Sequence, residues 1–226
     1  MMGTSIPLPL LQAFQQAQPH IKVIQGYGLT ETSPLITLVE PAKSQSKIGS
    51  IGKSVPGVEV KIVDKSGSEL PAGEPGEIIT RGPHVMKGYF RRPQATAERI
   101  RNGWLYTGDI GKADADGYYY HLGRRDDMII TGGLNVYPAE VENLIYTVPG
   151  VQEAVVFAIP DSKRGQVLGA AVVPRTGAQI SEKDLLIFLR ANLANFKVPD
   201  KIVVRASLPL TSSGKTVRDA AALLAE

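Results

Sequence analysis

The chain has 226 residues, 43% of them hydrophobic and 21% charged, with a net charge of +3. This composition excludes a disordered chain, and the scattered Lys and Arg residues do not form the basic stripe of a nucleic-acid-binding protein. With no cysteine and three dispersed histidines, His20, His84 and His121, neither a disulfide nor a zinc site is expected. The start lacks the regions of a signal peptide and no later segment could span a bilayer, so we expect a cytoplasmic protein without an integral membrane segment.

The first predicted elements lead into a motif that contains two glycines. Leu10, Leu11 and Phe14 at helical spacing predict a short helix, and residues 21–24 predict a strand. In residues 25–34 the glycines flank Tyr27, and Thr30 and Glu31 follow. Because open α/β sheets bind ligands beyond their strand ends, a base could stack on Tyr27 while Thr30 and Glu31 face phosphate and Mg²⁺. An ordinary turn with a surface glutamate is the alternative, and spacing alone favours it.

Residues 48–120 are dense in glycine and proline between short alternating runs, which predicts a small antiparallel β unit. Residues 58–62 and 76–80 are its clearest strands. In the segment 103–111, Asp109 stands on a glycine-containing turn, where a carboxylate could accept both hydroxyls of a ribose. The alternative is again a plain turn. Asp116-Gly117, before three tyrosines, predicts a hairpin.

Residues 123–138 combine four consecutive charges, an apolar triplet, Gly132-Gly133 and a proline that begins a helix. This order predicts a boundary between two domains, residues 1–123 and residues 124–226. Beyond it, a helix from Pro138 to Gly150, strands at 151–159, 168–173 and 201–204, and a helix capped by Ser181 predict a compact α+β unit.

The last stretch of chemical interest is residues 208–219, where small polar residues and Gly214 precede Lys215. A lysine on such a loop is a mobile point charge that could neutralise phosphate oxygens. The stretch does not satisfy the Walker phosphate-loop pattern, because the first glycine of that pattern is missing. A solvated lysine near the end of the chain is the alternative.

In their order and spacing, four motifs resemble the signatures of AMP-forming acyl-CoA synthetases of the adenylate-forming superfamily. They are residues 27–32, 103–109, 123–142 and 212–215. The resemblance implies an α+β fold. Residues 1–123 would be the C-terminal part of the large N-terminal domain, with nucleotide-site segments and a β-rich subdomain. Residues 124–226 would be a mobile C-terminal domain with a hinge and a catalytic lysine.

The activity implied by the resemblance is a two-step ligase reaction. A fatty or other carboxylic acid reacts with ATP to give acyl-AMP, and coenzyme A then takes the acyl group. The implied cofactors are ATP or AMP, Mg²⁺ and coenzyme A. The implied site residues are Tyr27 and Gly28 at the adenine, Asp109 and Arg124 at the ribose, Thr30 at the α-phosphate, Glu31 as the Mg²⁺ ligand, Asp126 as the hinge, Gly132 and Gly133 facing coenzyme A, and Lys215 as the catalytic lysine.

The sequence departs from the family in length, because members are more than twice as long and carry an upstream phosphate loop that is absent here. We therefore expect a fragment that needs a missing N-terminal half or a homo-oligomer, and that associates in isolation because its sheet is severed. Two alternatives stay open: a non-catalytic interaction module, and an adenylation domain that transfers its acyl group to a carrier protein. The sequence does not identify the carboxylic acid.

Overall fold

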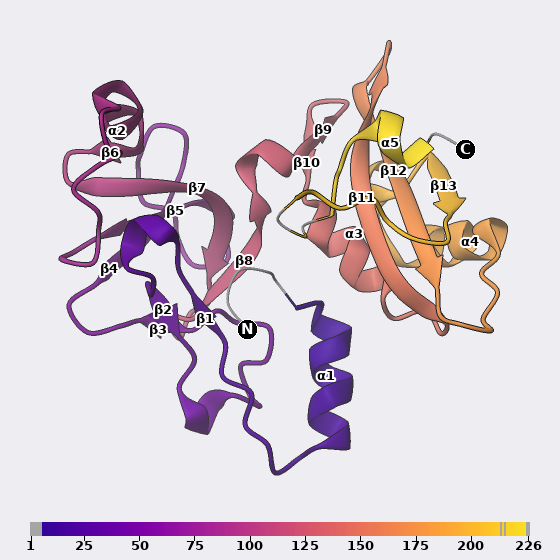
Figure 1. Cartoon of the computed structure of the whole chain (residues 1–226), viewed down its shortest axis with the longest axis horizontal. Coiled ribbons are helices and arrows are strands. Elements are labelled where there is room, and N and C mark those ends of the chain that lie inside the picture. The colour runs from indigo at the N-terminus through magenta and orange to yellow at the C-terminus, as the bar shows by residue number, and fades with distance from the viewer. Residues whose placement is uncertain (1–5, 213, 215, 225–226) are drawn as a thin grey trace. The chain divides into compact units, whose positions relative to one another are not determined.

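The computed structural model describes residues 6–212, 214 and 216–224, and it consists of two compact units (Figure 1). Unit 1 extends to Asp126 and unit 2 begins at Asp127. Our predicted boundary lay between residues 123 and 124. Each unit combines helices with a sheet, which confirms the predicted α+β class. No helix among the described residues is long and apolar enough to cross a bilayer.

Unit 1 contains two antiparallel sheets, a small one of three strands and a larger one of five. Its elements are α1 (Leu8–Ala17), β1 (Gly26–Tyr27), β2 (Thr37–Leu38), β3 (Lys53–Ser54), β4 (Glu59–Val63), β5 (Gly76–Arg81), α2 (Pro93–Arg99), β6 (Ile100–Arg101), β7 (Trp104–Ala113) and β8 (Tyr119–Arg124).

Strand β7 is the centre of the larger sheet. It pairs with β5 along one edge, while β6 and β8 share its other edge. Buried Ile62, Ile78, Leu105 and Ile110 from β4, β5 and β7 form the apolar interior of this sheet. The predicted β unit and its clearest strands are therefore confirmed. Strand β7 carries the candidate functional carboxylate, Asp109, near its middle.

The hairpin predicted at Asp116-Gly117 is present, with a loop of five residues between β7 and β8. Its organising residue is Asp114, whose Oδ1 accepts the backbone N–H groups of Asp116 at 3.0 Å and Tyr118 at 2.9 Å. The loop is further held by Lys47, whose ammonium lies 2.7 Å from Asp114 and 2.6 Å from Asp116. Asp114 therefore fixes the turn that returns the chain from β7 into β8.

The strand predicted at residues 21–24 is wrong, because the first strand is β1 at Gly26–Tyr27. Ile21 and Ile24 are exposed, and no described strand pairs with this segment. A run of β-branched residues shows a preference for extended structure, but a strand also needs a partner for its backbone hydrogen bonds.

Unit 2 has a five-stranded sheet around two long strands (Figure 1). Its elements are β9 (Ile129–Thr131), β10 (Leu134–Val136), α3 (Pro138–Ile145), β11 (Val151–Asp161), β12 (Gly165–Pro174), α4 (Glu182–Asn192), β13 (Lys201–Val204) and α5 (Ala220–Leu224). Strands β12 and β13 are parallel, and the other pairs are antiparallel.

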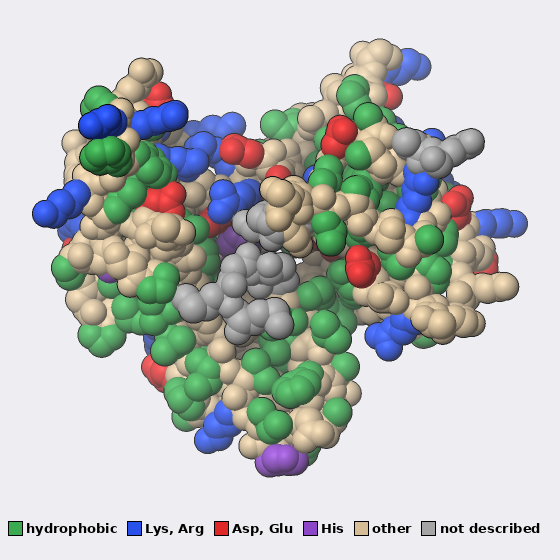
Figure 2. All heavy atoms as spheres, viewed as in Figure 1, with side chains coloured by type: hydrophobic (Ala, Val, Ile, Leu, Met, Phe, Trp, Pro, Cys, Tyr) green, Lys and Arg blue, Asp and Glu red, His purple; other side chains and the backbone are tan. Residues whose placement is uncertain are grey.

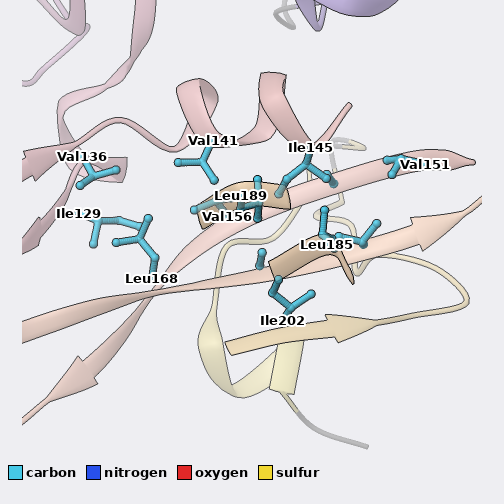
Figure 3. Close-up of a cluster of buried hydrophobic side chains, with 13 residues drawn as sticks. Ile129, Val136, Val141, Ile145, Val151, Val156, Leu168, Leu185, Leu189 and Ile202 are labelled. Atoms are coloured by element: carbon cyan, nitrogen blue, oxygen red, sulfur yellow. The ribbon is translucent and has the colours of Figure 1, made fainter. Parts of the chain in front are cut away.

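The long strands of unit 2 bury side chains on both faces of the sheet. On one face Val156 and Leu168 pack with Val141 and Ile145 of α3 and with Leu185 of α4 and their neighbours (Figure 3). On the other face, Val155, Phe157, Ala171 and Val173 pack with Leu223 of α5. Because successive strand residues point to opposite faces, these nearly continuous apolar strands require helices on both sides.

The helix boundaries of unit 2 follow local signals. Pro138 occupies the first turn of α3, where its missing N–H is no loss. Before α4, the Ser181 hydroxyl accepts the Asp184 N–H at 3.2 Å, which confirms the predicted capping pattern.

Candidate functional site

Side chains from three strands of unit 1 meet around the carboxylate of Asp109, which is only 2% exposed. The Tyr27 hydroxyl of β1 donates a hydrogen bond of 2.7 Å to Oδ2. Two groups of β8 lie near Oδ1, with Arg124 Nε at 3.4 Å and His121 Nε2 at 3.6 Å. Both distances exceed those of an ordinary N–H···O hydrogen bond. The structure thus brings Tyr27, Asp109 and Arg124 together, and adds His121.

Thr107 and Gly108, where the sequence suggested a turn, lie inside β7 at a register shift against β5, and they fix the backbone beside Asp109. The Thr107 hydroxyl donates to Ile78 O at 2.7 Å and accepts the Asp109 N–H at 3.0 Å. Gly108 has φ +76°, in the left-handed region that a residue with a Cβ rarely adopts. Its N–H donates to Glu77 Oε1 at 2.9 Å. These contacts make the Asp109 backbone rigid.

An irregularity in the β7–β8 ladder lets two side chains of β8 reach the same carboxylate. Asp109 pairs with Arg124 and Gly111 pairs with His121, with a register shift between Ile110 and Gly111. In a regular strand, residues three positions apart point to opposite faces. A bulge breaks this alternation and is a common way to redirect a side chain toward a site. The bulge therefore explains why both Arg124 and His121 face Asp109.

The electrostatics of the cluster keep Asp109 ionised. Burial alone would raise the pKa of the Asp109 carboxyl, but His121, the Tyr27 hydroxyl and the charge of Arg124 together hold that pKa below its ordinary value. The pKa of the Tyr27 phenol is raised, first by burial and then by the charge of Asp109. Tyr27 is therefore a hydrogen-bond donor and Asp109 an acceptor at neutral pH.

The loop after β1 depends on Gly28. A Cβ on this residue would lie 1.5 Å from Pro34 O, so only glycine fits. The 3₁₀ turn Thr30–Thr32 follows. The Thr32 hydroxyl accepts the Leu29 N–H and donates to Leu29 O, both at 2.9 Å. Gly28 thus acts in the structure by allowing the turn that places the next residues.

Thr30 is exposed in this turn, and Glu31 is half-buried. Glu31 is held at both ends, because its backbone O accepts the Met86 N–H at 2.8 Å and its Oε1 accepts the Tyr89 hydroxyl at 2.8 Å. Within the part of the chain that the structure describes, no three His, Cys, Asp or Glu side chains cluster as a metal site. Glu31 therefore offers a single protein carboxylate, which fits Mg²⁺ because that ion often takes one or two carboxylates together with phosphates and waters.

A hollow rich in arginine, with a volume of about 330 Å³, lies elsewhere on unit 1, next to β7. It is lined by Glu77, Glu98, Arg99, Arg101, Tyr106 and Arg125. Figure 2 shows Lys and Arg side chains gathered over the part of unit 1 that carries α2 and β6. Glu77 Oε2 accepts Arg125 Nη1 at 3.2 Å while Oε1 holds Gly108. Glu77 therefore connects the backbone next to Asp109 with Arg125.

The structure describes the surroundings of the predicted hinge, Asp126, and of the glycine pair Gly132-Gly133. The Asp126 side chain is 80% exposed and lies 3.7 Å from Arg125, at the end of unit 1. In unit 2, Gly132 and Gly133 form the two-residue turn between β9 and β10, with φ of +55° and +81°. Two successive positive φ values are typical of a type I′ hairpin, which explains the glycine pair. The Gly132 N–H donates to Arg164 O at 3.0 Å.

Lys215 lies outside the described residues, so its role stays a prediction. Leu210 and Thr216, which stand on either side of it in the sequence, form an isolated antiparallel β-bridge. Three residues after Lys215, Arg218 donates to Glu142 of α3 through both Nη atoms, and to Val156 O of β11 at 2.7 Å. Arg218 thus ties the chain that follows Lys215 to the core of unit 2.

Sequence reasoning missed His121, Tyr89, Glu77 and Arg218. The histidines were judged by their separation in the sequence, which says nothing about a carboxylate on the neighbouring strand. Expected hairpin pairing between residues 104–113 and 119–124 could have placed His121 near Asp109. The bulge that brings in both His121 and Arg124 has no signal in the sequence.

Two family profiles match the chain. The profile "AMP-binding enzyme" matches residues 1–90, and the profile "AMP-binding enzyme C-terminal domain" matches residues 140–215. The feruloyl-CoA synthase of Amycolatopsis sp. is 43% identical over 212 residues, which are 94% of this chain and 43% of that protein. A long-chain-fatty-acid–CoA ligase of Bacillus subtilis (strain 168) is 42% identical over 217 residues, 96% of this chain and 38% of that protein.

The o-succinylbenzoate CoA synthetase (MenE) from Bacillus subtilis is similar in structure. Its complex with the acyl-adenylate intermediate OSB-AMP matches with a TM-score of 0.87 at 41% identity, over 96% of this chain and 44% of that one. Its complex with ATP and a magnesium ion matches with a TM-score of 0.85 at 40% identity. The chain spans about two fifths of the length of these relatives. Because the two profiles describe one family and together cover most of the sequence, this chain belongs to the family of AMP-binding enzymes that includes the acyl-CoA synthetases.

Proposed function

We propose that this chain carries the adenosine-binding segments and the C-terminal domain of an AMP-forming acid–thiol ligase. The enzyme activates a carboxylic acid with ATP and passes the acyl group to coenzyme A. The observation that carries the proposal is the buried, ionised Asp109, whose Oδ1 faces the Arg124 guanidinium at 3.4 Å and the His121 imidazole at 3.6 Å, both longer than ordinary hydrogen bonds. A buried carboxylate with remaining acceptor capacity needs a partner, and ribose hydroxyls supply such donors.

In this proposal Asp109 accepts hydrogen bonds from the ribose hydroxyls. Arg124, which lies beside the same carboxylate, makes a second contact with the ribose. The Tyr27 hydroxyl fixes Oδ2, so the phenol ring beside it forms a wall against which adenine packs. Gly28 keeps the backbone of this wall free of a Cβ. The nucleoside is bound by groups that are already held in place, which lowers the cost of ordering them on binding.

Thr30 and Glu31 act next to the phosphates. The exposed Thr30 hydroxyl would donate to the α-phosphate, and Glu31, whose Oε1 accepts the Tyr89 hydroxyl, would hold Mg²⁺. When bound, the ion would neutralise phosphate charge and orient the nucleotide. Tyr89 therefore serves to orient the Glu31 carboxylate. The magnesium and ATP complex of the MenE relative supports this part of the proposal.

The last residue of unit 1, Asp126, and three residues of unit 2 complete the proposed site. Lys215 neutralises the carboxylate and phosphate oxygens in the adenylation step, since positioning and charge stabilisation are most of what a protein contributes at a phosphorus centre. Asp126 is the hinge at which the backbone rotates between the two steps. The exposed turn Gly132-Gly133 faces coenzyme A, because two residues without side chains leave room for a thiol ligand.

The relatives differ in the acid that they activate, since their names give ferulate, long-chain fatty acids and o-succinylbenzoate. This chain is almost equally identical to all three relatives. We therefore propose a carboxylic acid as its substrate and assign no narrower class. Their names support coenzyme A as the acceptor over a carrier protein. A location in the cytoplasm fits a thiol acceptor that is a soluble metabolite.

The test is ATP–pyrophosphate exchange with a panel containing ferulate, palmitate and o-succinylbenzoate. The chain is assayed alone and after addition of a polypeptide that carries the N-terminal part of a relative. We expect exchange with at least one acid in the complemented reaction, and its loss with Lys215→Ala. Thioester formation with coenzyme A should require the same components. No exchange with any acid, although the two polypeptides form a complex, would refute the ligase assignment.

A further inference from the structure

His121 is the one residue of the Asp109 cluster to which the proposed function gives no role. Its Nε2 lies 3.6 Å from Oδ1 of Asp109, the proposed ribose acceptor, and its side chain is only 19% exposed. The ring centroid is 5.9 Å from that of Tyr27, at an interplanar angle of 33°. The imidazole therefore lies beside both the Tyr27 ring and the Asp109 carboxylate.

Both protonation states of the ring have a defined effect on Oδ1. A neutral imidazole at 3.6 Å leaves the lone pairs of Oδ1 able to accept hydroxyl groups. An imidazolium at the same place is attracted to the buried carboxylate by charge, and in a partly buried site such an attraction is considerably stronger than in water. A charged His121 would then occupy the acceptor that ribose requires.

We propose that His121 is a positioning residue of the nucleoside site, which leaves Asp109 Oδ1 open to ribose when neutral and closes it when protonated. The inference rests on the proposed binding of a nucleoside at Asp109 and adds a pH dependence to it. His121 acts on the ligand through the carboxylate and needs no contact with the nucleotide.

Few other groups near His121 titrate between pH 5.5 and 7.5. The charged and titratable groups that the described structure places against the ring are Asp109 from β7, Tyr27 from β1 and Arg124 from its own strand. The pKa of Asp109 is below its ordinary value and that of Tyr27 is raised, so both keep one form over this range. Arginine is always charged. His121 is therefore the side chain of this cluster that the comparison of the two pH values addresses.

Adenosine is the appropriate probe, because the phosphate of a nucleotide itself titrates near pH 6. Its Kd is measured with the whole chain at pH 7.5 and pH 5.5 from NMR chemical shifts of the Gly108 and Asp109 amides. A site that binds only with a neutral imidazole loses affinity in proportion to the fraction of protein that carries the proton, and we look for a loss of roughly tenfold over this range. We expect that loss in the wild type.

Three comparisons separate His121 from other causes. In His121→Asn, which cannot be protonated, Kd should change less than twofold between the two pH values. His20→Asn, which removes an exposed histidine between α1 and β1, should keep the tenfold loss. In the wild type, 2′,3′-dideoxyadenosine lacks both hydroxyls, so its weaker binding should show little pH dependence. This last comparison needs no substitution and is unaffected by any folding defect.

The outcomes distinguish this inference from the proposed function. Adenosine that binds equally well at pH 7.5 and 5.5, or a tenfold loss that persists in His121→Asn, would overturn the role of His121 and leave the nucleoside site intact. If adenosine does not bind at pH 7.5, both the nucleoside site and the inference that depends on it are refuted.

Discussion

Tyr27 and Asp109 are 82 positions apart in the sequence, yet the Tyr27 hydroxyl donates a hydrogen bond of 2.7 Å to the Asp109 carboxylate. This bond links the end of β1 to the middle of β7. Both residues belong to motifs that the sequence presents separately, so their contact turns two weak local signals into one site.

Tyr27→Phe tests the strength of this link. The substitution keeps the ring but removes the donor from a buried carboxylate, which we expect to lower the free energy of unfolding by about 1.5–3 kcal/mol. Urea denaturation followed by the fluorescence of Trp104, the only tryptophan and a residue of β7, reports on unit 1. Tyr118→Phe is the matched control, because its hydroxyl makes only a 3.4 Å contact with Glu40. An equal loss in both variants would contradict the assignment.

The contribution of Asp109 to stability should depend on pH in one direction. Because its folded pKa lies below the ordinary value of 3.8, the ionised carboxylate stabilises the folded chain at pH values above about 4, and this contribution is lost as pH falls through the folded pKa. The difference in unfolding free energy between wild type and Asp109→Asn should therefore shrink as the pH falls below about 4. Asp126→Asn, at an exposed side chain, should show a much smaller difference. A difference that grows as the pH falls below about 4 would contradict the predicted sign.

Gly28→Ala should be one of the most damaging single changes in unit 1. The new Cβ would overlap Pro34 O at 1.5 Å, and backbone atoms cannot rotate away as a side chain can. We expect a loss above about 4 kcal/mol, in the range seen only for specific structural defects. At Gly26, the nearest atoms to an added Cβ are in the side chains of Leu35 and Leu38, at 3.0 and 3.1 Å, and the backbone O of Thr37 lies at an ordinary contact distance of 3.4 Å. Gly26→Ala should cost less, and denaturation curves that rank the two variants the other way would reject this explanation.

Arg218 should be a principal anchor of unit 2. Its guanidinium binds Glu142 and Val156 O, and Glu142 also accepts the Val156 N–H at 2.8 Å. Removing one partner of a buried ion pair costs about 3–5 kcal/mol, and because the Arg218 side chain is 32% exposed we expect about 2–3 kcal/mol for Arg218→Ala. Arg190→Ala, on the exposed end of α4, should cost under about 1 kcal/mol.

The energetic coupling between Arg218 and Glu142 gives a second check of this prediction. In a double-mutant cycle, Arg218→Ala and Glu142→Ala should be strongly non-additive, because each removes the other's partner. Unfolding is followed by amide hydrogen exchange of β11, since unit 2 has no tryptophan. Additive losses would mean that the pair does not act as a unit.

Much of unit 2 could be predicted from its sequence, because its signals are local. The apolar spacing from Val141 to Val148, the proline at the start of α3 and the Ser181 cap each act within a few residues, and all correspond to observed elements. The strand predicted at 21–24 failed because pairing is not local. A run of β-branched residues favours an extended backbone, but it forms a strand only where a second strand pairs with it.

The candidate site was predictable in its motifs and not in its contacts. Tyr27, Asp109 and Arg124 stand in recognisable segments, and the structure brings these three together. The addition of His121 depends on a register shift between β7 and β8. Such a shift arises from how two strands fit each other, so neither segment shows it when considered alone. For the same reason, nothing in the sequence indicated that Tyr89 orients Glu31.

The most direct test of the account is equilibrium binding of an adenylate to the Asp109 site. A 5′-O-acylsulfamoyl adenosine, which imitates an acyl-adenylate without reacting, is titrated into wild type and Asp109→Asn at pH 7.5. A ligand that binds the folded state at 100 times its Kd stabilises that state by about 2.7 kcal/mol. We predict a clear rise in the melting temperature of the wild type and a much smaller rise in Asp109→Asn. No rise in the wild type, or the same rise in both proteins, would contradict the assignment of Asp109 as the ribose acceptor.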